Sequence, residues 1–123
     1  LPHNYPENSV AYTGTHDNET IAGWWKSITV KERKLARDYL CDNWTPDKDL
    51  YKCFIRLVMR SSAKLCVIPM QDYMGLDNSC RMNQPSTVGK NWKWRIRKRE
   101  LTVKLQKEIH DIALRYGRMN WSD

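Results

Sequence analysis

The sequence predicts an α/β fold whose elements stand in the order of the end of a βα barrel, on three observations. Two short apolar runs have the length of buried parallel strands. Helical patterns lie between these runs and after the second one. Polar residues follow each run where it enters a loop, which is where barrels of this kind carry their chemistry. We therefore expect a strand, three helices, a second strand, a long loop and a last helix, all in one segment over residues 1–123.

The first strand is predicted over residues 10–13, which are short and mostly apolar. A helical pattern resumes over residues 18–25. Asp17 or Asn18 is the expected N-cap of this first helix, because a short polar side chain can accept from its exposed backbone N–H groups.

Two further helices are expected before the second strand. Thr29 and Glu32 have the spacing of a capping box and predict a helix over residues 30–41. Thr45 followed by Pro46 has the pattern of an N-cap with proline in the first turn. The helix that they open has one apolar stripe, formed by Leu50, Phe54, Leu57, Val58 and Ser61.

The second strand is predicted over residues 64–69, a mainly apolar run that ends in a proline. Residues 75–89 have no sustained period and predict a functional loop. The last helix ends at Gly117, a typical stop signal. Its apolar face is formed by Leu101, Leu105, Ile109, Ile112, Ala113 and Tyr116.

The net charge of +7 permits a second interpretation, a basic module that binds nucleic acid. Basic residues gather at positions 90–99 and alternate with Trp92 and Trp94, an arrangement that can serve single-stranded nucleic acid. A solvated surface leading into a helix is the favoured interpretation of this run. We therefore expect no nucleic-acid partner.

The four cysteines are widely spaced and include no Cys-x-x-Cys pair, so we expect reduced thiols and no zinc site. No run is long and apolar enough to predict a membrane span, and none has the pattern of a signal peptide. We expect a cytoplasmic protein without a membrane partner, or a plastid protein if the source is a plant or alga.

Six blocks of the sequence resemble the C-terminal part of the amylomaltase family, the 4-α-glucanotransferases. The blocks are LPHNY at residues 1–5, YTGTHDN at 12–18, GWW at 23–25, PMQDYMGL at 69–76, RMNQP at 81–85 and GKNWKWR at 89–95. They stand in the order of that family and at about its spacing. The resemblance extends from residue 1 to about residue 100.

The resemblance implies a retaining enzyme that cleaves α-1,4-glucans or maltooligosaccharides and transfers the glucosyl part to the 4-hydroxyl of another sugar. It places the transition-state-stabilising carboxylate on Asp17 and a sugar-binding role on His16. The nucleophile and the acid/base of the family come from strands that would precede Leu1. We therefore expect a fragment that acts together with the missing N-terminal part of the same protein and is inactive alone, with no cofactor and no metal. A related α-glucan hydrolase remains an alternative.

Further site residues are expected beyond the second strand. Asn83, Gln71 and Asp72 are candidate substrate-binding residues, although Asp72 could equally be a structural partner of Arg81 or Arg95. Ser86 stands where the resemblance implies glycine, which puts the local turn in question. Four residues are expected to brace this loop, with Trp92 placed in the core: Asn91, Trp92, Trp94 and Arg95.

Overall fold

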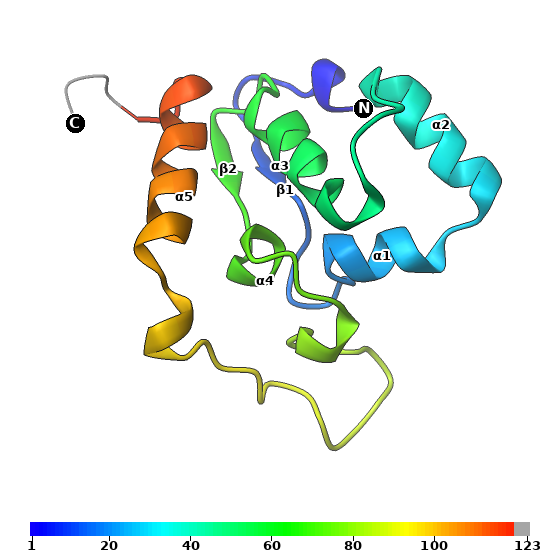
Figure 1. Ribbon diagram of the computed structural model, residues 1–123, viewed down its shortest axis with the longest axis vertical. Coiled ribbons are helices and arrows are strands. Elements are labelled where there is room, and N and C mark those ends of the chain that lie inside the picture. The colour runs from blue at the N-terminus through cyan, green and yellow to red at the C-terminus, as the bar shows by residue number, and fades with distance from the viewer. Residues whose placement is uncertain (120–123) are drawn as a thin grey trace.

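The computed structural model describes residues 1–119 and confirms the α/β class. Figure 1 shows two short strands at the centre, with the longer helices around them. The strands are β1 (Val10–Tyr12) and β2 (Leu65–Val67), and the α-helices are α1 (Ile21–Ser27), α2 (Val30–Leu40), α3 (Tyr51–Met59), α4 (Met70–Tyr73) and α5 (Val103–Arg115). Short 3-10 turns occur at Pro2–Asn4, Asp47–Asp49, Asn78–Cys80 and Lys98–Glu100.

The two strands pair in parallel, as the strand–helix–strand order predicts. In the register, Val10 is opposite Leu65 and Ala11 is opposite Cys66. Ala11 is buried, and its side chain packs with Val58 of α3. The helices thus cover one face of this small sheet.

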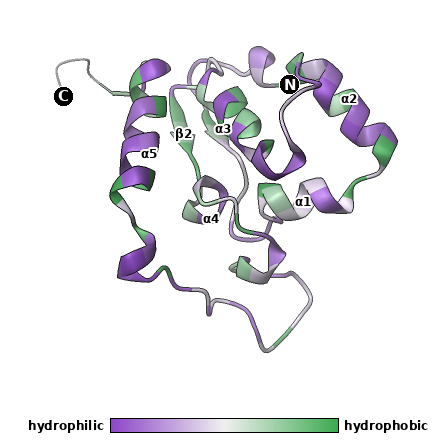
Figure 2. Cartoon of the chain, viewed as in Figure 1, coloured by the Kyte–Doolittle hydropathy of each residue, from purple (hydrophilic) through white to green (hydrophobic). Residues whose placement is uncertain are grey.

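The opposite face of the sheet is apolar and uncovered in residues 1–119. Its side chains are Val10, Tyr12, Leu65 and Val67, which are between 42% and 59% exposed. Figure 2 shows β2 coloured hydrophobic, whereas the charged helix α2 is mostly hydrophilic. Parallel sheets are normally covered on both faces, so this face has the character of an interior surface.

The main core lies between α1, α3 and α5. Ile21, Ile55 and Met59 form its buried centre, and Ile112 of α5 and Tyr116, directly after α5, pack against them. Each fully buried side chain of this size stabilises the fold by roughly 1.5–3 kcal/mol. The predicted last helix is confirmed. The predicted stripe of the third helix is confirmed in part, because Leu50 and Val58 are buried but the stripe left out Ile55 and Met59.

Helix α1 begins later than expected. Its N-cap is Thr20, whose hydroxyl oxygen accepts from the backbone N–H of Gly23 at 3.1 Å. The prediction of Asp17 or Asn18 as the cap was wrong, because Asn18 turns back and its side-chain oxygen accepts from the backbone N–H of Thr15 at 2.7 Å. Residues 13–20 are consequently a loop rather than a first helical turn.

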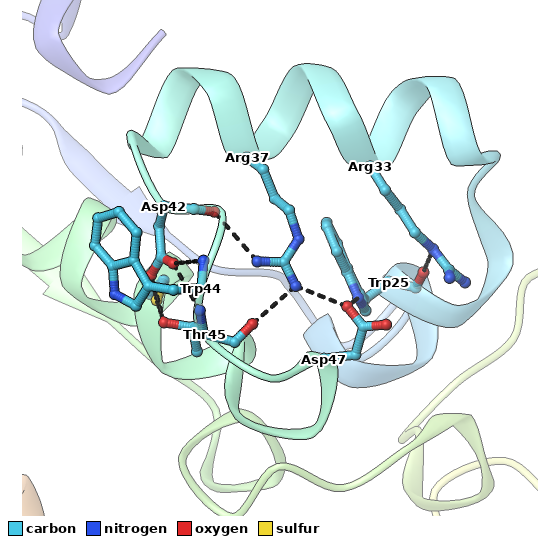
Figure 3. A network of polar contacts seen from close by, with 8 residues as sticks. Trp25, Arg33, Arg37, Asp42, Trp44, Thr45 and Asp47 are labelled. Atoms are coloured by element: carbon cyan, nitrogen blue, oxygen red, sulfur yellow. Dashed lines mark hydrogen bonds and ion pairs between the residues drawn. The ribbon is translucent and has the colours of Figure 1, made fainter.

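Helix α2 has the predicted capping box, with the Glu32 carboxylate accepting from the backbone N–H of Thr29 at 2.7 Å. Its Arg33 and Arg37 lie over the ring of Trp25 from α1, each with its guanidinium carbon 5.6 Å from the ring centre (Figure 3). The indole N–H of Trp25 and the guanidinium of Arg37 both donate to Asp47. These contacts fasten α2 to α1 and to the turn before α3.

The expectation that Thr45 caps the third helix was wrong. The Thr45 hydroxyl donates to the carboxylate of Asp42, and the Thr45 backbone N–H donates to the same carboxylate at 2.8 Å (Figure 3). These bonds hold the pKa of Asp42 at about 2. Thr45 is therefore used to close the loop between α2 and α3, and a 3-10 turn at Asp47–Asp49 leads into α3 instead.

Helix α5 is anchored to the rest of the chain by Arg118, which lies just beyond it. The guanidinium donates to four backbone carbonyls at the end of α3 and the start of β2, those of Met59, Ser61, Ala63 and Lys64. Gly117 allows the chain to reach this position, because its φ of +67° is a left-handed conformation. Within residues 1–119, no helix has the length and apolar character needed to cross a bilayer.

Candidate active site

The candidate site lies at the carboxyl ends of the two parallel strands. Residues 13–20 leave β1 at this edge, and the short helix α4 follows β2 there. Side chains that follow neighbouring parallel strands come together at such an edge, and ligands commonly bind there. The two polar blocks of the sequence thus meet in space.

His16, Asp17 and Asn83, predicted as site residues from distant blocks, form one cluster. The Asn83 amide donates to the Asp17 carboxylate at 2.6 Å, and the Asn83 backbone N–H donates to the His16 carbonyl at 3.1 Å. His16 Nε2 lies 3.3 Å from the other carboxylate oxygen of Asp17. Arg81 donates to the Asp17 carbonyl at 3.1 Å. All three predicted residues keep part of their surface exposed and can reach a ligand.

Asp72 is nearby but almost completely buried, at 2% exposure. Its two carboxylate oxygens accept from the Thr13 hydroxyl at 2.6 Å and from the Ile21 backbone N–H at 2.8 Å. The alternative in which Asp72 pairs with Arg81 or Arg95 was wrong, because its bonds go to Thr13 and Ile21 instead. Burial raises the pKa of Asp72, and the two hydrogen bonds act in the opposite direction.

Gln71 is also buried, and its amide nitrogen donates to the carbonyl of Cys80 at 3.3 Å. This bond ties α4 to the turn at Asn78–Cys80. The side chain still lines a pocket that also contains His16. Gln71 therefore combines a structural bond with access to the site.

The loop after Asn83 is held by its own residues. The Asn91 side chain accepts from the Gln84 backbone N–H at 3.0 Å and donates to the Thr87 carbonyl at 2.9 Å. The Arg95 guanidinium donates to the carbonyls of Trp92 and Trp94. Both side chains make contacts of the kind expected of loop braces.

Trp92 is not in the core, contrary to expectation. It is 51% exposed in the described part of the chain, and its ring centre lies 5.0 Å from that of His16. Its backbone N–H donates to the Met82 carbonyl, next to Asn83. The indole thus borders the candidate site instead of packing beneath it.

Sequence reasoning missed Asn78, which joins the turn after α4 to the start of α1. Its side-chain oxygen accepts from the Thr20 backbone N–H at 3.2 Å, and its amide donates to Glu19 at 2.8 Å. The Asn78 side chain can lie this close to α1 only because residue 23 is glycine: a Cβ at Gly23 would lie 2.2 Å from the Asn78 side-chain oxygen. A glycine inside a helical pattern is the one signal that indicated this close contact.

Two pockets of about 460 and 580 Å³ adjoin the cluster. His16 lines the first and Asp17 the second, and Arg81 lines both. Arg81 Nε is buried without a hydrogen-bond partner among residues 1–119, and such a donor favours an acceptor nearby. Over the same residues, no group of three or more His, Cys, Asp or Glu side chains is placed to hold a metal ion.

Comparison with known proteins identifies the family. A family model described as 4-alpha-glucanotransferase matches residues 1–102. The chain belongs to the 4-α-glucanotransferase family. The chain is 39% identical over 122 residues to the 4-alpha-glucanotransferase, chloroplastic/amyloplastic, of Solanum tuberosum. It is 41% identical over 119 residues to the 4-alpha-glucanotransferase of Clostridium butyricum.

A solved structure of the family has the same arrangement. The amylomaltase from Streptococcus agalactiae in complex with acarbose matches 98% of this chain with a TM-score of 0.89 and 38% identity. This chain covers 24% of the length of that amylomaltase chain. The match to the Solanum tuberosum protein covers 97% of this chain and 21% of that protein. The match to the Clostridium butyricum protein covers 96% of this chain and 24% of that protein. The chain thus spans about a quarter or less of the length of each of these three proteins.

Proposed function

We propose that this segment is the closing part of the (β/α)8 barrel of a 4-α-glucanotransferase that transfers α-1,4-glucan segments between maltooligosaccharides or starch-derived and glycogen-derived glucans. The observation that carries the proposal is the Asp17 carboxylate, held by Asn83 beside His16 at the strand ends of a chain that matches this family. A relative with acarbose bound supports an oligosaccharide ligand. The bare apolar face of the sheet supports further strands of the barrel.

The proposed reaction is a retaining double displacement. A carboxylate nucleophile outside these residues attacks the anomeric carbon, while an acid protonates the departing glycosidic oxygen. The acid, now deprotonated, then acts as a base and takes the proton of the 4-hydroxyl of a second sugar. The oxygen of that hydroxyl attacks the anomeric carbon and displaces the nucleophile. Nothing in these steps calls for a cofactor or a metal.

Asp17 acts in this scheme by accepting hydrogen bonds from hydroxyls of the sugar at the cleavage point. Bonds to a carboxylate are charge-assisted, and those that strengthen as the ring flattens lower the barrier. The contribution is on the order of a hundredfold or more in rate. His16 supplies a further polar contact to the sugar, and its imidazole is aligned by Asp17 at 3.3 Å.

Asn83, Gln71 and Arg81 surround the same space and complete the proposed sugar contacts. Asn83 keeps an amide oxygen for a ligand while its nitrogen is bonded to Asp17. The half-exposed indole of Trp92 offers a flat face beside His16, of the kind that stacks on a sugar ring. The basic run at residues 90–99 is a solvated surface in this proposal.

The deciding experiment incubates the full-length protein that contains this segment with maltotriose and separates the products by chain length. We expect glucose together with maltooligosaccharides longer than maltotriose, and Asp17→Asn should lower their rate of formation about a hundredfold or more. Asp38→Asn is the matched control, because this exposed carboxylate pairs with Lys34 on α2. Products limited to glucose and maltose would indicate a hydrolase, and an unaffected Asp17→Asn variant would contradict the role of Asp17.

A further inference from the structure

The loop that carries His16 and Asp17 has its two ends fastened to one side chain. Thr13, at the start of the loop, donates its hydroxyl proton to one oxygen of Asp72 at 2.6 Å. Ile21, where α1 begins, donates its backbone N–H to the other oxygen at 2.8 Å. The two donors are separated by seven residues of loop, and a single carboxylate holds both ends together.

The hydrogen bonds of Asp72 contribute strongly to stability because its carboxylate is buried. Asp72 is 2% exposed, and a buried carboxylate without partners would be strongly destabilising. With one strong donor on each oxygen, the side chain is fixed, and its partners are fixed with it. The hydrogen bond to Ile21 also places a carboxylate at the first N–H groups of α1, where negative charge is favourable.

The segment after β2 makes further hydrogen bonds to the same loop. Asn78 accepts from Thr20 and donates to Glu19, while Asn83 donates to Asp17. Asp72 differs from these residues because it is the one that bonds both ends of the loop and is nearly inaccessible to a sugar. It lies at the floor of the pocket that His16 lines, with both carboxylate oxygens already bonded to the loop.

We infer that Asp72 is a positioning residue, which acts through Thr13 and Ile21 to fix the loop that presents His16 and Asp17 to the substrate. The inference rests on the proposed function and replaces the substrate-binding role expected for Asp72. A loop that moves by about 1 Å can cost roughly a hundredfold in rate, because transition-state contacts depend on placement. We call the two hydrogen bonds of Asp72, to Thr13 and to Ile21, the clamp. Loss of the clamp should lower kcat more than it changes KM, because Asp17 acts mainly in the transition state.

The test uses the full-length protein and begins with Thr13→Val, which removes one hydroxyl and keeps the shape of the side chain. We expect kcat to fall about tenfold with a KM changed less than about twofold, and Thr13→Ser to recover most of that loss. Thr29→Val is the matched control, because it removes a hydroxyl that accepts from the first turn of α2, away from the site. It should lower the thermal midpoint and leave kcat unchanged.

Asp72→Asn separates positioning from direct contact with sugar. An amide can accept from Ile21 with its oxygen and donate to the Thr13 hydroxyl with its nitrogen, so it can hold both ends without a charge. We expect Asp72→Asn to retain kcat within about tenfold. A carboxylate that bound sugar would instead lose about a hundredfold or more with its charge.

Amide hydrogen exchange of residues 14–20 gives a readout that does not depend on activity. Exchange there should rise in Thr13→Val and stay unchanged in Thr29→Val. Unaltered exchange in Thr13→Val, or a wild-type kcat in that variant, would overturn the clamp and leave the transferase proposal standing. Faster exchange in a protein that forms no transfer products would retain the clamp and overturn the proposed function.

Discussion

At the scale of single residues, the loop after Asn83 contains two backbone positions that are costly for their side chains. Ser86 has a φ of +63° and Trp92 a φ of +62°. This left-handed conformation costs roughly 1–2 kcal/mol for a residue with a Cβ. The resemblance implies glycine at the position of Ser86, and the structure gives the reason: the turn there is one that glycine adopts without strain.

Ser86→Gly should therefore stabilise the loop by up to about 1 kcal/mol, the strain relieved less the extra freedom of glycine in the unfolded chain. Ser86→Ala is the matched control, because it retains the Cβ and the strain. The thermal midpoints of both variants in the full-length protein measure the difference. Equal midpoints for the two variants would mean that φ at residue 86 carries no cost.

Polar residues at strand ends and the resemblance to the amylomaltase family together predicted part of the candidate site. The resemblance gave His16 and Asp17 their expected roles, Asn83 was expected beyond the second strand, and the structure brings the three into contact. The bonds of Asp72 could not be predicted, because one partner is a backbone N–H and the other is Thr13, an ordinary residue at the end of a strand. Such pairs depend on the three-dimensional path of the loop, which a residue pattern does not encode.

At the scale of elements, helix α5 illustrates how packing and a single cation act together. Its apolar face supplies Ile112 and Tyr116 to the core, but no apolar pattern predicts the guanidinium of Arg118 on the carbonyls that end α3. Arginine suits this position because its donors form a rigid fork and its charge complements the negative end of a helix.

Arg118→Met should release the end of α5 and lower stability by about 1.5–3 kcal/mol, the usual range for a hydrogen bond to a charged group. Faster amide exchange in α5 measures the release directly. Arg115→Met provides the control, because Arg115 is an exposed cation on the same helix. Equal exchange in the two variants would contradict the anchoring role of Arg118.

Element boundaries were predicted well where local chemistry decides them and poorly where tertiary contacts do. The capping box at Thr29 was confirmed because both its hydrogen bonds lie within one turn. Thr45 has an equally good local pattern, but its hydroxyl donates a hydrogen bond to the Asp42 carboxylate instead of capping the helix. In the same way, Thr20 caps α1 while Asn18 bonds back to Thr15. Competing acceptors nearby in space decide which polar residue becomes a cap.

At the scale of the whole molecule, the described residues contain one covered and one bare face of a two-stranded sheet. The bare face consists of the side chains of Val10, Tyr12, Leu65 and Val67. In the described residues, β1 and β2 pair with each other, and each has one unpaired edge. Two strands alone are marginally stable, so the core around α3 must carry most of the stability. This arrangement fits a segment that completes a larger sheet.

The 123-residue chain by itself should form no transfer products from maltotriose, because the proposed nucleophile and acid/base lie outside it. The full-length protein under the same conditions provides the positive control. Chromatography of the products by chain length measures the outcome. Glucose and longer oligosaccharides from the isolated chain would contradict the assignment of the missing groups to the rest of the barrel.

The bond between Thr13 and Asp72 has one further consequence, for strand pairing. Thr13 follows β1 directly, and Asp72 lies five residues beyond the end of β2, so their distance depends on how the strands are aligned. A slip of one residue would move β1 along β2 by about 3.3 Å and turn Ala11 away from α3. It would also break a buried bond to a carboxylate. The bond therefore favours the native alignment over a slipped one, because a slipped pair of strands would lose one of the two hydrogen bonds that the buried Asp72 carboxylate accepts.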